Sequence, residues 1–289
     1  MGTILDGKAL AQRVRLRVKD AVAGFRAQHG YTPGLATVLI GDDPVSRVYV
    51  GTKEKACREV GMQSLGYRLP VTASTAEALA LIRELNRRPD VQGILIQLPL
   101  PPQLEKEKLI EALAREKDVD ALHPWNQGKL LLGEEGLRPC TPLGVMRLIE
   151  ESGVSLTGKR AVVIGRSLLV GKPVALMLLE SNATVTCCHS RTERLADEVQ
   201  VADIVVAAVG HPEVIKGAWI KEGAVVIDVG ISRLSDGSLR GDVEFDAAKE
   251  RAAFITPVPG GVGPMTVAML LSNTLKTAEQ QARQVRTEQ

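Results

Sequence analysis

The chain of 289 residues carries a net charge of +2, and only 3% of its residues are aromatic. This length allows two domains with large cores, whereas the balanced charge and scarce aromatic residues argue against a nucleic-acid-binding protein and against a protein of anionic membrane surfaces. The four cysteines (Cys57, Cys140, Cys187 and Cys188) form no C-x-x-C pair, so we expect small buried thiols in a reducing compartment and no metal site.

The first half of the chain shows strand and helix patterns in alternation. Its opening residues contain no apolar signal core, and no apolar run is long enough to cross a bilayer, so the expected location is the cytoplasm. Apolar residues at helical spacing predict an amphipathic helix over residues 10–25. Short apolar runs predict strands at 34–41 and 91–98, and the capping box Ser74-Thr75-Ala76-Glu77 predicts a helix from there to Asn86.

The second half begins after an irregular stretch. Residues 123–142 are rich in Gly and Pro and have no clean period, and we interpret them as the crossing between domains. Four apolar runs follow at 161–165, 183–189, 204–210 and 225–230, as is typical of strands covered on both faces. A helix after Pro264 ends the chain. We therefore predict an α/β fold in two lobes, with the final helix returning to the first lobe and the active site in the cleft between them.

Residues 160–173 combine a strand, a glycine turn and the start of a helix. Pro173 suits the first helical turn, and the free amides of a helix N-terminus behind a glycine turn favour a pyrophosphate. Ser167 stands where G-x-G-x-x-G has its second glycine, and Gly171 comes one residue late. The segment therefore predicts a dinucleotide site and also fits a tight turn without a ligand.

The end of the following strand favours NADP over NAD. A chain that binds NAD usually places a carboxylate there for the ribose hydroxyls, but this strand ends in CHSRT. Arg166, Ser190 and Arg191 would accept a 2′-phosphate. They also fit a reading as solvated loop residues.

Polar residues gather on one face of a helix that follows the strand at 34–41. Ser46 is a plausible N-cap, and Tyr49 and Lys53 follow it at i+3 and i+7. A Tyr–Lys pair one turn apart can transfer protons, because a desolvated lysine can lose its charge near neutrality. Taken alone, most Tyr-x-x-x-Lys patterns are ordinary helix faces.

Two further polar groups come from the same half. Gln97 ends the strand at 91–98, and strand carboxyl ends are where ligands sit in open α/β sheets. Asp120 lies in the sequence Asp118-Val119-Asp120 just ahead of the irregular stretch, where it also fits a turn-forming acidic pair.

Eight stretches taken together resemble one family, bifunctional methylenetetrahydrofolate dehydrogenase/methenyltetrahydrofolate cyclohydrolase. They run in family order from Asp42 to Thr266, and they read DDPVSRVYVGTK, GILIQLPLP, KDVDALHP, PCTP, GRSLLVGKP, CHSRT, DVGI and TPVPGGVGPMT. The resemblance implies that methylenetetrahydrofolate gives a hydride to NADP and that water then opens the methenyl cation to 10-formyltetrahydrofolate. It also implies a homodimer that acts on a tetrahydrofolate derivative.

The resemblance further implies a role for each matching residue. Lys53 would be the central catalytic group, and Gln97 would hydrogen-bond it and tune it. Asp120 would bind the amino-pyrimidine edge of the pterin, Tyr49 would pack on the folate, and Ser46 would be a supporting polar group. Further substrate contacts are implied for Leu98, Pro259 and Gly260. The implied cofactor-binding residues are Thr141, Gly165, Arg166, Ser167, Ser190, Arg191, Ile231, Gly263 and Thr266.

The resemblance assigns residues 1–122 to a catalytic, folate-binding domain joined by the C-terminal helix at about 268–289, and residues 140–267 to a Rossmann-like NADP-binding domain. Two positions depart from the family pattern. Val45 stands where the family usually has alanine, and Ala121 stands where it usually has glycine, which restricts φ beside Asp120.

Two alternatives to this function are considered. The first is another NADP-dependent dehydrogenase, such as a short-chain enzyme, which also uses Tyr-x-x-x-Lys. In that class the glycine loop precedes the Tyr–Lys pair, whereas here Tyr49 and Lys53 precede the Gly165 loop. A non-catalytic nucleotide-sensing protein would keep the Gly165 loop and would not need Lys53, Gln97 and Asp120 together.

Overall fold

The computed structural model describes residues 1–287 and divides into two compact units. Unit 1 comprises Met1–Gln12, Leu130–Glu134 and Thr141–Thr266, and unit 2 comprises Arg13–Lys129, Glu135–Cys140 and Val267–Gln289. Each unit is thus assembled from three separate stretches of chain. The boundaries fall within or beside the helices α1 (Gly7–His29), α5 (Pro124–Leu131), α6 (Cys140–Glu151) and α10 (Val262–Thr287). Within residues 1–287, the helices are too short or too polar to span a membrane.

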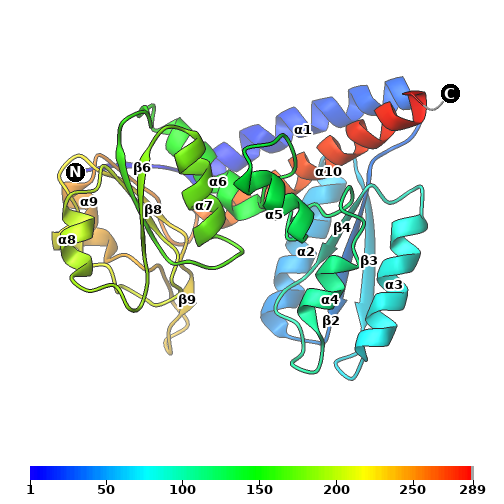
Figure 1. Cartoon of the computed structure of the whole chain (residues 1–289), viewed down its shortest axis with the longest axis horizontal. Helices are drawn as coiled ribbons and strands as arrows, with labels where there is room; N and C mark the ends of the chain where they lie inside the picture. The colour runs from blue at the N-terminus through cyan, green and yellow to red at the C-terminus, as the bar shows by residue number, and fades with distance from the viewer. Residues whose placement is uncertain (288–289) are drawn as a thin grey trace. The chain divides into compact units, whose positions relative to one another are not determined.

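Unit 2 is built on a three-stranded parallel sheet in the order β3-β2-β4. Every residue of the central strand β2 (Gly34–Ile40) is buried, because helices cover both faces of the sheet (Figure 1). On one face, Val38 of β2 and Ile94 of β4 (Gly93–Ile96) pack with Ile82 of α3 (Thr75–Arg87). On the other face, Thr274 of α10 lies against Gly93, where a Cβ would come within 3.4 Å of its side chain.

The remaining elements of unit 2 complete these layers. They are α2 (Pro44–Glu59), which follows β2, β3 (Gln63–Leu69) at one edge of the sheet, and α4 (Lys106–Glu111) beside α3. The capping box that begins α3 is present, because the Ser74 hydroxyl accepts from the Glu77 N–H at 3.2 Å and the Glu77 carboxylate accepts from the Ser74 N–H at 2.8 Å. This helix therefore begins where the sequence predicts.

Unit 1 is built on a six-stranded parallel sheet in the order β1-β11-β8-β7-β5-β6. The strands are β1 (Thr3–Ile4), β5 (Arg160–Ile164), β6 (Thr184–Cys188), β7 (Ile204–Ala207), β8 (Val225–Asp228) and β11 (Phe254–Ile255). The chain runs from β5 outward to β6 and then returns to the other side of β5 for β7. The strand order therefore reverses between β5 and β7, as in a Rossmann-like dinucleotide-binding fold.

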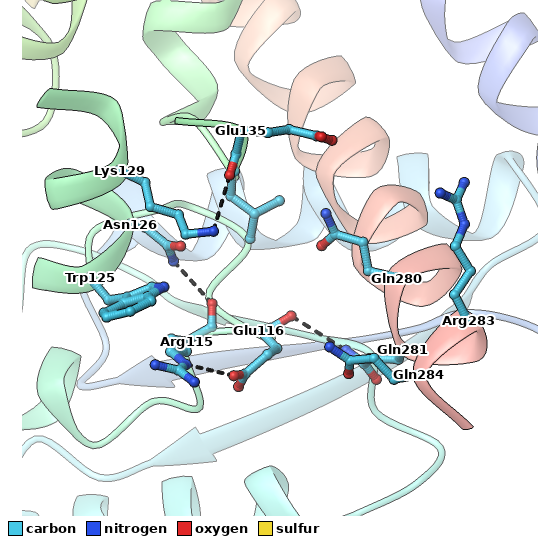
Figure 2. A pocket seen from close by; sticks show the side chains of 12 residues that line it. Arg115, Glu116, Trp125, Asn126, Lys129, Glu135, Gln280, Gln281, Arg283 and Gln284 are labelled. Atoms are coloured by element: carbon cyan, nitrogen blue, oxygen red, sulfur yellow. Dashed lines mark hydrogen bonds and ion pairs between the residues drawn. The ribbon is translucent and has the colours of Figure 1, made fainter. Parts of the chain in front are cut away.

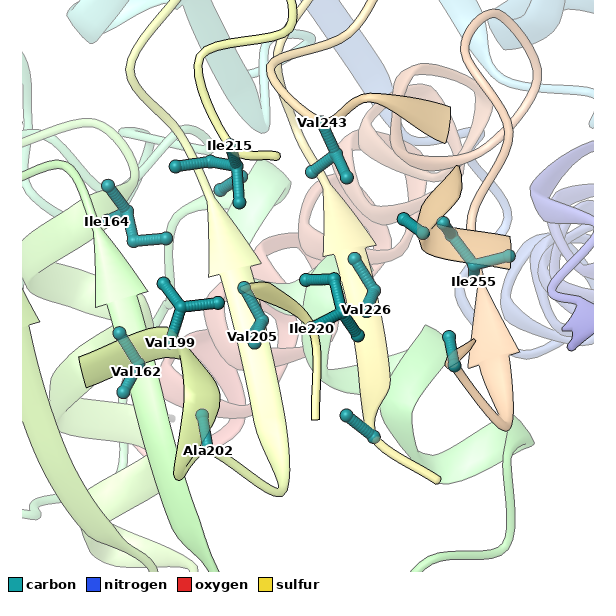
Figure 3. Close-up of a cluster of buried hydrophobic side chains, with 14 of the residues drawn as sticks. Val162, Ile164, Val199, Ala202, Val205, Ile215, Ile220, Val226, Val243 and Ile255 are labelled. Atoms are coloured by element: carbon teal, nitrogen blue, oxygen red, sulfur yellow. The ribbon is translucent and has the colours of Figure 1, made fainter. Parts of the chain in front are cut away.

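Helices and a short hairpin surround this sheet. Figure 3 shows one face, where Val162, Val205 and Val226 from three neighbouring strands pack with side chains from the segments that cover this face, among them Val199 of α8 and Ile220. The covering elements are α7 (Gly171–Glu180), α8 (Leu195–Gln200), α9 (Phe245–Arg251) and the 3₁₀ turn Gly217–Trp219, and the hairpin pairs β9 (Ser232–Arg233) with β10 (Leu239–Arg240).

The predicted α/β class is confirmed, with a Rossmann-like sheet in unit 1 and a C-terminal helix whose part from Val267 belongs to unit 2. The last two positions of that predicted helix, 288–289, lie outside the described residues. The stretch 123–142, which the sequence indicates as the crossing between domains, contains unit boundaries after Lys129, Glu134 and Cys140, and it also holds α5 and the start of α6. One expectation was wrong. Only Cys188 of β6 is buried, because β6 is an edge strand, and Cys187 is exposed.

Candidate functional site

The best-defined polar cluster in unit 2 centres on Lys53. Its side chain extends from α2 and donates a hydrogen bond of 2.9 Å to the Oε1 atom of Gln97, which directly follows β4. The Gln97 amide nitrogen donates to the carbonyl of Leu98, so the orientation of the amide is fixed at both ends. The glutamine therefore offers its oxygen to the lysine, and that contact is equally available to a charged or a neutral amine.

Burial lowers the pKa of Lys53, and the nearby Asp120 carboxylate opposes this change in part. With a lowered pKa, the amine of Lys53 loses its proton at a lower pH than the amine of a lysine in water. A neutral lysine can accept a proton, so this position suits a general base.

Cys140 belongs to the same cluster, although the sequence predicts only a buried hydrophobic residue there. Its thiol is buried, lies 3.3 Å from the carbonyl oxygen of Val119, and interacts with both Asp120 and Lys53. Burial, together with the Asp120 charge, raises the pKa of the Cys140 thiol, so the group is a neutral thiol and a poor nucleophile. No pattern of spacing marks this cysteine, because its neighbours come from distant segments.

Two contacts determine the position of the loop that carries Asp120. The buried Asp118 carboxylate accepts hydrogen bonds from the His123 N–H at 2.7 Å and from the Asn126 side chain at 2.9 Å. Ala121 is buried and has φ +53°, the left-handed conformation that glycine adopts most easily. The alanine at this position therefore accepts the conformation that a glycine would take, and it does so at an energetic cost.

The N-terminal turn of α2 differs from the prediction in its cap. The N-cap is Asp43, whose carboxylate accepts from the Ser46 N–H at 2.7 Å, and not Ser46. Pro44 explains the earlier start, because proline favours the first helical position. Ser46 is instead a buried residue of the first turn, whereas Tyr49, one turn before Lys53, keeps 39% of its surface exposed.

A separate cavity of about 360 Å³ opens in unit 2 and contains none of the predicted site residues. Figure 2 shows Trp125 on one side and the α10 residues Gln280 and Arg283 on the other. Arg115 stacks over the Trp125 ring with its guanidinium carbon 4.3 Å from the ring centroid. Asn126, which holds Asp118, also lines this cavity.

In unit 1 the glycine turn after β5 is tightly packed. Gly165 has φ +119°, and a Cβ there would lie 2.2 Å from the carbonyl oxygen of Ala208, in the segment after β7. A Cβ on Gly171 would lie 2.1 Å from the carbonyl oxygen of Gly165. Both glycines are therefore required by close backbone approach. The turn leads into the start of α7 at the point where the strand order reverses, a position that favours a phosphate ligand.

The other predicted cofactor residues lie around this turn or in neighbouring loops of unit 1. The Ser167 hydroxyl accepts from the Val170 N–H at 3.1 Å. Arg166 follows β5, and Ser190 and Arg191 follow the adjacent parallel strand β6, so the carboxyl ends of two neighbouring strands present these three exposed residues. Ile231 is 48% exposed in the segment after β8.

The final predicted group lies near the start of α10. The hydroxyls of Thr141 and Thr266 lie 3.0 Å apart. Pro259 and Gly260 form the loop before α10, in which Gly260 has φ +112°, and Gly263 belongs to the first turn of the helix. The Gly261 N–H donates to the Pro257 carbonyl at 2.8 Å and closes this loop.

Comparison with known families identifies the chain. Residues 5–120 match the model of the tetrahydrofolate dehydrogenase/cyclohydrolase catalytic domain, and residues 139–282 match that of the tetrahydrofolate dehydrogenase/cyclohydrolase NAD(P)-binding domain. The chain belongs to the tetrahydrofolate dehydrogenase/cyclohydrolase family. The family assignment agrees with the resemblance that the eight sequence stretches indicate.

Individual relatives agree over nearly the whole chain. The "Bifunctional protein FolD" of Geotalea uraniireducens is 59% identical over 279 residues, which cover 96% of this chain and 99% of that protein. The crystal structure of the FolD dehydrogenase/cyclohydrolase of Campylobacter jejuni superposes with a TM-score of 0.95 at 46% identity and covers 97% of this chain and all of that one.

A third relative was solved with ligands. The FolD enzyme of Trypanosoma brucei, complexed with NADP and an inhibitor, has a TM-score of 0.94 at 41% identity, with 98% of this chain and 99% of that chain covered. Both solved relatives thus share the fold of this chain over nearly its whole length.

Proposed function

We propose that this chain oxidises methylenetetrahydrofolate to methenyltetrahydrofolate with NADP and hydrolyses methenyltetrahydrofolate to 10-formyltetrahydrofolate. The observation that carries the proposal is Lys53, a lysine with a lowered pKa that Gln97 holds beside Asp120. Its setting in a chain with full-length bifunctional relatives connects this chemistry to folate.

Lys53 serves the hydrolytic step as a proton acceptor. Water adds to the methenyl carbon and loses a proton to the neutral amine. The bond from this carbon to N5 then breaks, N5 takes up a proton as the carbinol hydroxyl loses one, and the formyl group remains on N10, so one proton is released overall. The methenyl compound is a cation, so a second positive charge beside it would be unfavourable. The lowered pKa of Lys53 removes that charge, and Gln97 directs the amine.

The other residues of this cluster bind and orient the folate. The Asp120 carboxylate receives the N–H donors of the pterin edge, which a carboxylate accepts well. The exposed Tyr49 ring packs on the folate, and the buried Ser46 supports the helix turn that carries Tyr49 and Lys53. Leu98, Pro259 and Gly260 complete the substrate contacts.

The residues of unit 1 fit a bound dinucleotide, because the Gly165 turn leads into the N-terminus of α7 at the point where the strand order reverses. When bound, NADP accepts the hydride. The turn and the α7 N-terminus hold the pyrophosphate, and Arg166, Ser190 and Arg191 hold the 2′-phosphate. Thr141, Ser167, Ile231, Gly263 and Thr266 make the remaining cofactor contacts.

The same proposal extends to organisation. Residues 1–122 with the helix from about 268 form the folate-binding domain, and residues 140–267 form the NADP-binding domain. The enzyme is a cytoplasmic homodimer, as the family resemblance implies.

The test is a pair of spectrophotometric assays, NADP reduction with methylenetetrahydrofolate and loss of methenyltetrahydrofolate absorbance. Wild-type protein should perform both. Lys53→Met should abolish hydrolysis, and Lys53→Arg should also fail because a guanidinium does not deprotonate in a protein. The matched control is Lys55→Met, on the same helix, where Lys55 is exposed and pairs only loosely with Glu59 at 3.9 Å. Wild-type hydrolysis in Lys53→Met would overturn the assignment.

A further inference from the structure

Two buried aspartates join the loops at the carboxyl edge of the unit 1 sheet. Asp242 accepts three backbone N–H groups from the segment after β7, from Val209 at 2.6 Å, Gly210 at 3.1 Å and His211 at 3.0 Å. Asp228, the last residue of β8, accepts from the backbone N–H groups of Gly230, Asp242 and Val243 at 2.9–3.0 Å. Through residues 242–243, which lie between β10 and α9, the two carboxylates therefore connect the segment after β7 to the carboxyl end of β8.

Glycines make this arrangement tight. A Cβ on Gly230 would lie 2.1 Å from Oδ1 of Asp242, and a Cβ on Gly241 would lie 2.0 Å from Oδ2 of Asp228. The Asp242 carboxylate thus packs against Gly230, two residues after Asp228, and the Asp228 carboxylate packs against Gly241, the residue before Asp242. Little freedom remains for either segment to move without breaking hydrogen bonds.

The segment that Asp242 holds is also a wall of the dinucleotide turn. It begins at Ala208, whose carbonyl oxygen abuts Gly165, and the Ala208 N–H donates to Ile164 of β5 at 2.7 Å. The reversal of strand order lies between β5 and β7, so this wall borders the crevice where doubly wound folds bind nucleotides. None of the hydrogen bonds of Asp242 is needed to build the strands themselves.

We propose that Asp242 is a positioning residue for NADP, which acts without touching the cofactor by holding residues 209–211 in the binding conformation beside the Gly165 turn. The inference rests on the proposed function, because it takes NADP as the dinucleotide. Pre-ordering this segment removes an ordering cost that binding would otherwise carry. Asp242 thus affects the affinity for NADP indirectly, through the segment 209–211 that it holds.

A carboxylate is required at this position. Both oxygens of Asp242 are used, Oδ2 by Val209 and Gly210 and Oδ1 by His211. An asparagine has one acceptor oxygen, so in either orientation of its amide at least one N–H loses its partner and faces another donor. Loss of one charge-assisted hydrogen bond corresponds to about a 10- to 100-fold change in an equilibrium constant.

The experiment measures NADP affinity of the full-length enzyme by titration calorimetry, with the NADP KM and kcat from the dehydrogenase assay. Asp242→Asn should raise the Kd and KM for NADP about tenfold or more, with kcat at saturating NADP reduced less than about threefold. The matched control is Asp203→Asn. Asp203 accepts from the Arg160 N–H at 2.9 Å and from Lys221 at 2.6 Å at the opposite, amino edge of the same sheet. This control should leave the Kd for NADP within about twofold, since it alters the hydrogen bonds of a carboxylate of the same sheet far from the crevice.

Each outcome either supports or overturns the proposed role of Asp242. Unchanged NADP affinity in Asp242→Asn overturns the proposal, as does an equal loss of affinity in Asp203→Asn, which would reflect general destabilisation. If Asp242→Asn does not fold, hydrogen exchange of the wild-type enzyme without cofactor decides. Slow exchange of the Val209, Gly210 and His211 amides supports the proposal, and exchange at the rate of an open loop refutes it. Wild-type enzyme that binds NADP without reducing it refutes the proposed function alone.

Discussion

Replacing Gln97 by glutamate tests directly whether Lys53 acts as a neutral amine. The substitution places a carboxylate oxygen where the Gln97 Oε1 atom now lies, 2.9 Å from the Lys53 amine. At an effective dielectric constant of about 20, opposite charges about 4 Å apart attract by roughly 4 kcal/mol, and solvent screening reduces this to about 2–4 kcal/mol. That energy raises the lysine pKa by about 1.5–3 units.

The sign follows from the protonation state that the carboxylate favours. In the wild type, burial lowers the pKa of Lys53, so hydrolysis should increase with pH as the amine loses its proton, below the pH at which a free lysine would do so. In Gln97→Glu the ascending limb of kcat/KM for hydrolysis should move to higher pH, and the rate at pH 7.5 should fall by about 30-fold or more.

The assay is loss of methenyltetrahydrofolate absorbance from pH 6 to 10, corrected for the uncatalysed reaction. The control is Gln97→Met, which removes the hydrogen bond without adding charge and should lower the rate without an alkaline displacement. If Gln97→Glu keeps the wild-type pH profile, Lys53 does not act through its neutral form.

Three further predictions concern other parts of the chain. Arg166→Ala should weaken kcat/KM for NADP about tenfold or more and leave that for NAD within about twofold, because only NADP has the 2′-phosphate; equal losses would place Arg166 elsewhere. Ala121→Gly should change the free energy of unfolding by less than about 1 kcal/mol, because relief of the left-handed strain is offset by the lost methyl group and a more flexible unfolded chain. Ala121→Val should lower the free energy of unfolding in urea by more than about 2 kcal/mol, because a β-branched residue is strained at this positive φ. Burial raises the pKa of Asp228 to about 7, so between about pH 4 and 7 the folded state retains a proton that the unfolded state has lost, and stability should decrease as pH rises; urea unfolding at pH 5 and 8 should show a smaller decrease in Asp228→Asn.

The fold was predictable where local chemistry agrees with burial. The capping box at Ser74 and the all-buried strand β2 are examples, because hydrogen bonding and apolar runs specify them locally. The edge strand β3 was not predicted, because it is half exposed, contains Gly66 and lacks the continuous apolar run of a buried strand. The short helix α5 was missed because glycine and proline signals dominate its neighbourhood.

The candidate site divides in the same way. The family resemblance implied that Gln97 would hydrogen-bond Lys53, and their side chains are hydrogen-bonded. Cys140 could not be placed beside them from local patterns, because its approach to Asp120 depends on segments that are distant in sequence. Asp242 was missed for a similar reason, since its partners at 209–211 lie more than thirty positions earlier.

The order in which the ribosome releases the chain constrains how each unit can be completed. The sheet of unit 2 emerges first, yet Asn273 of α10 supplies the amide that holds the carbonyls of Val119 at 2.8 Å and Arg138 at 2.9 Å. Unit 1, in contrast, has all of its strands once β11 has been made, because its edge strand β1 was synthesised at the outset. All the strands of both units are therefore synthesised before the part of α10 from Val267 that belongs to unit 2, so unit 2 is the last of the two units to receive all of its residues.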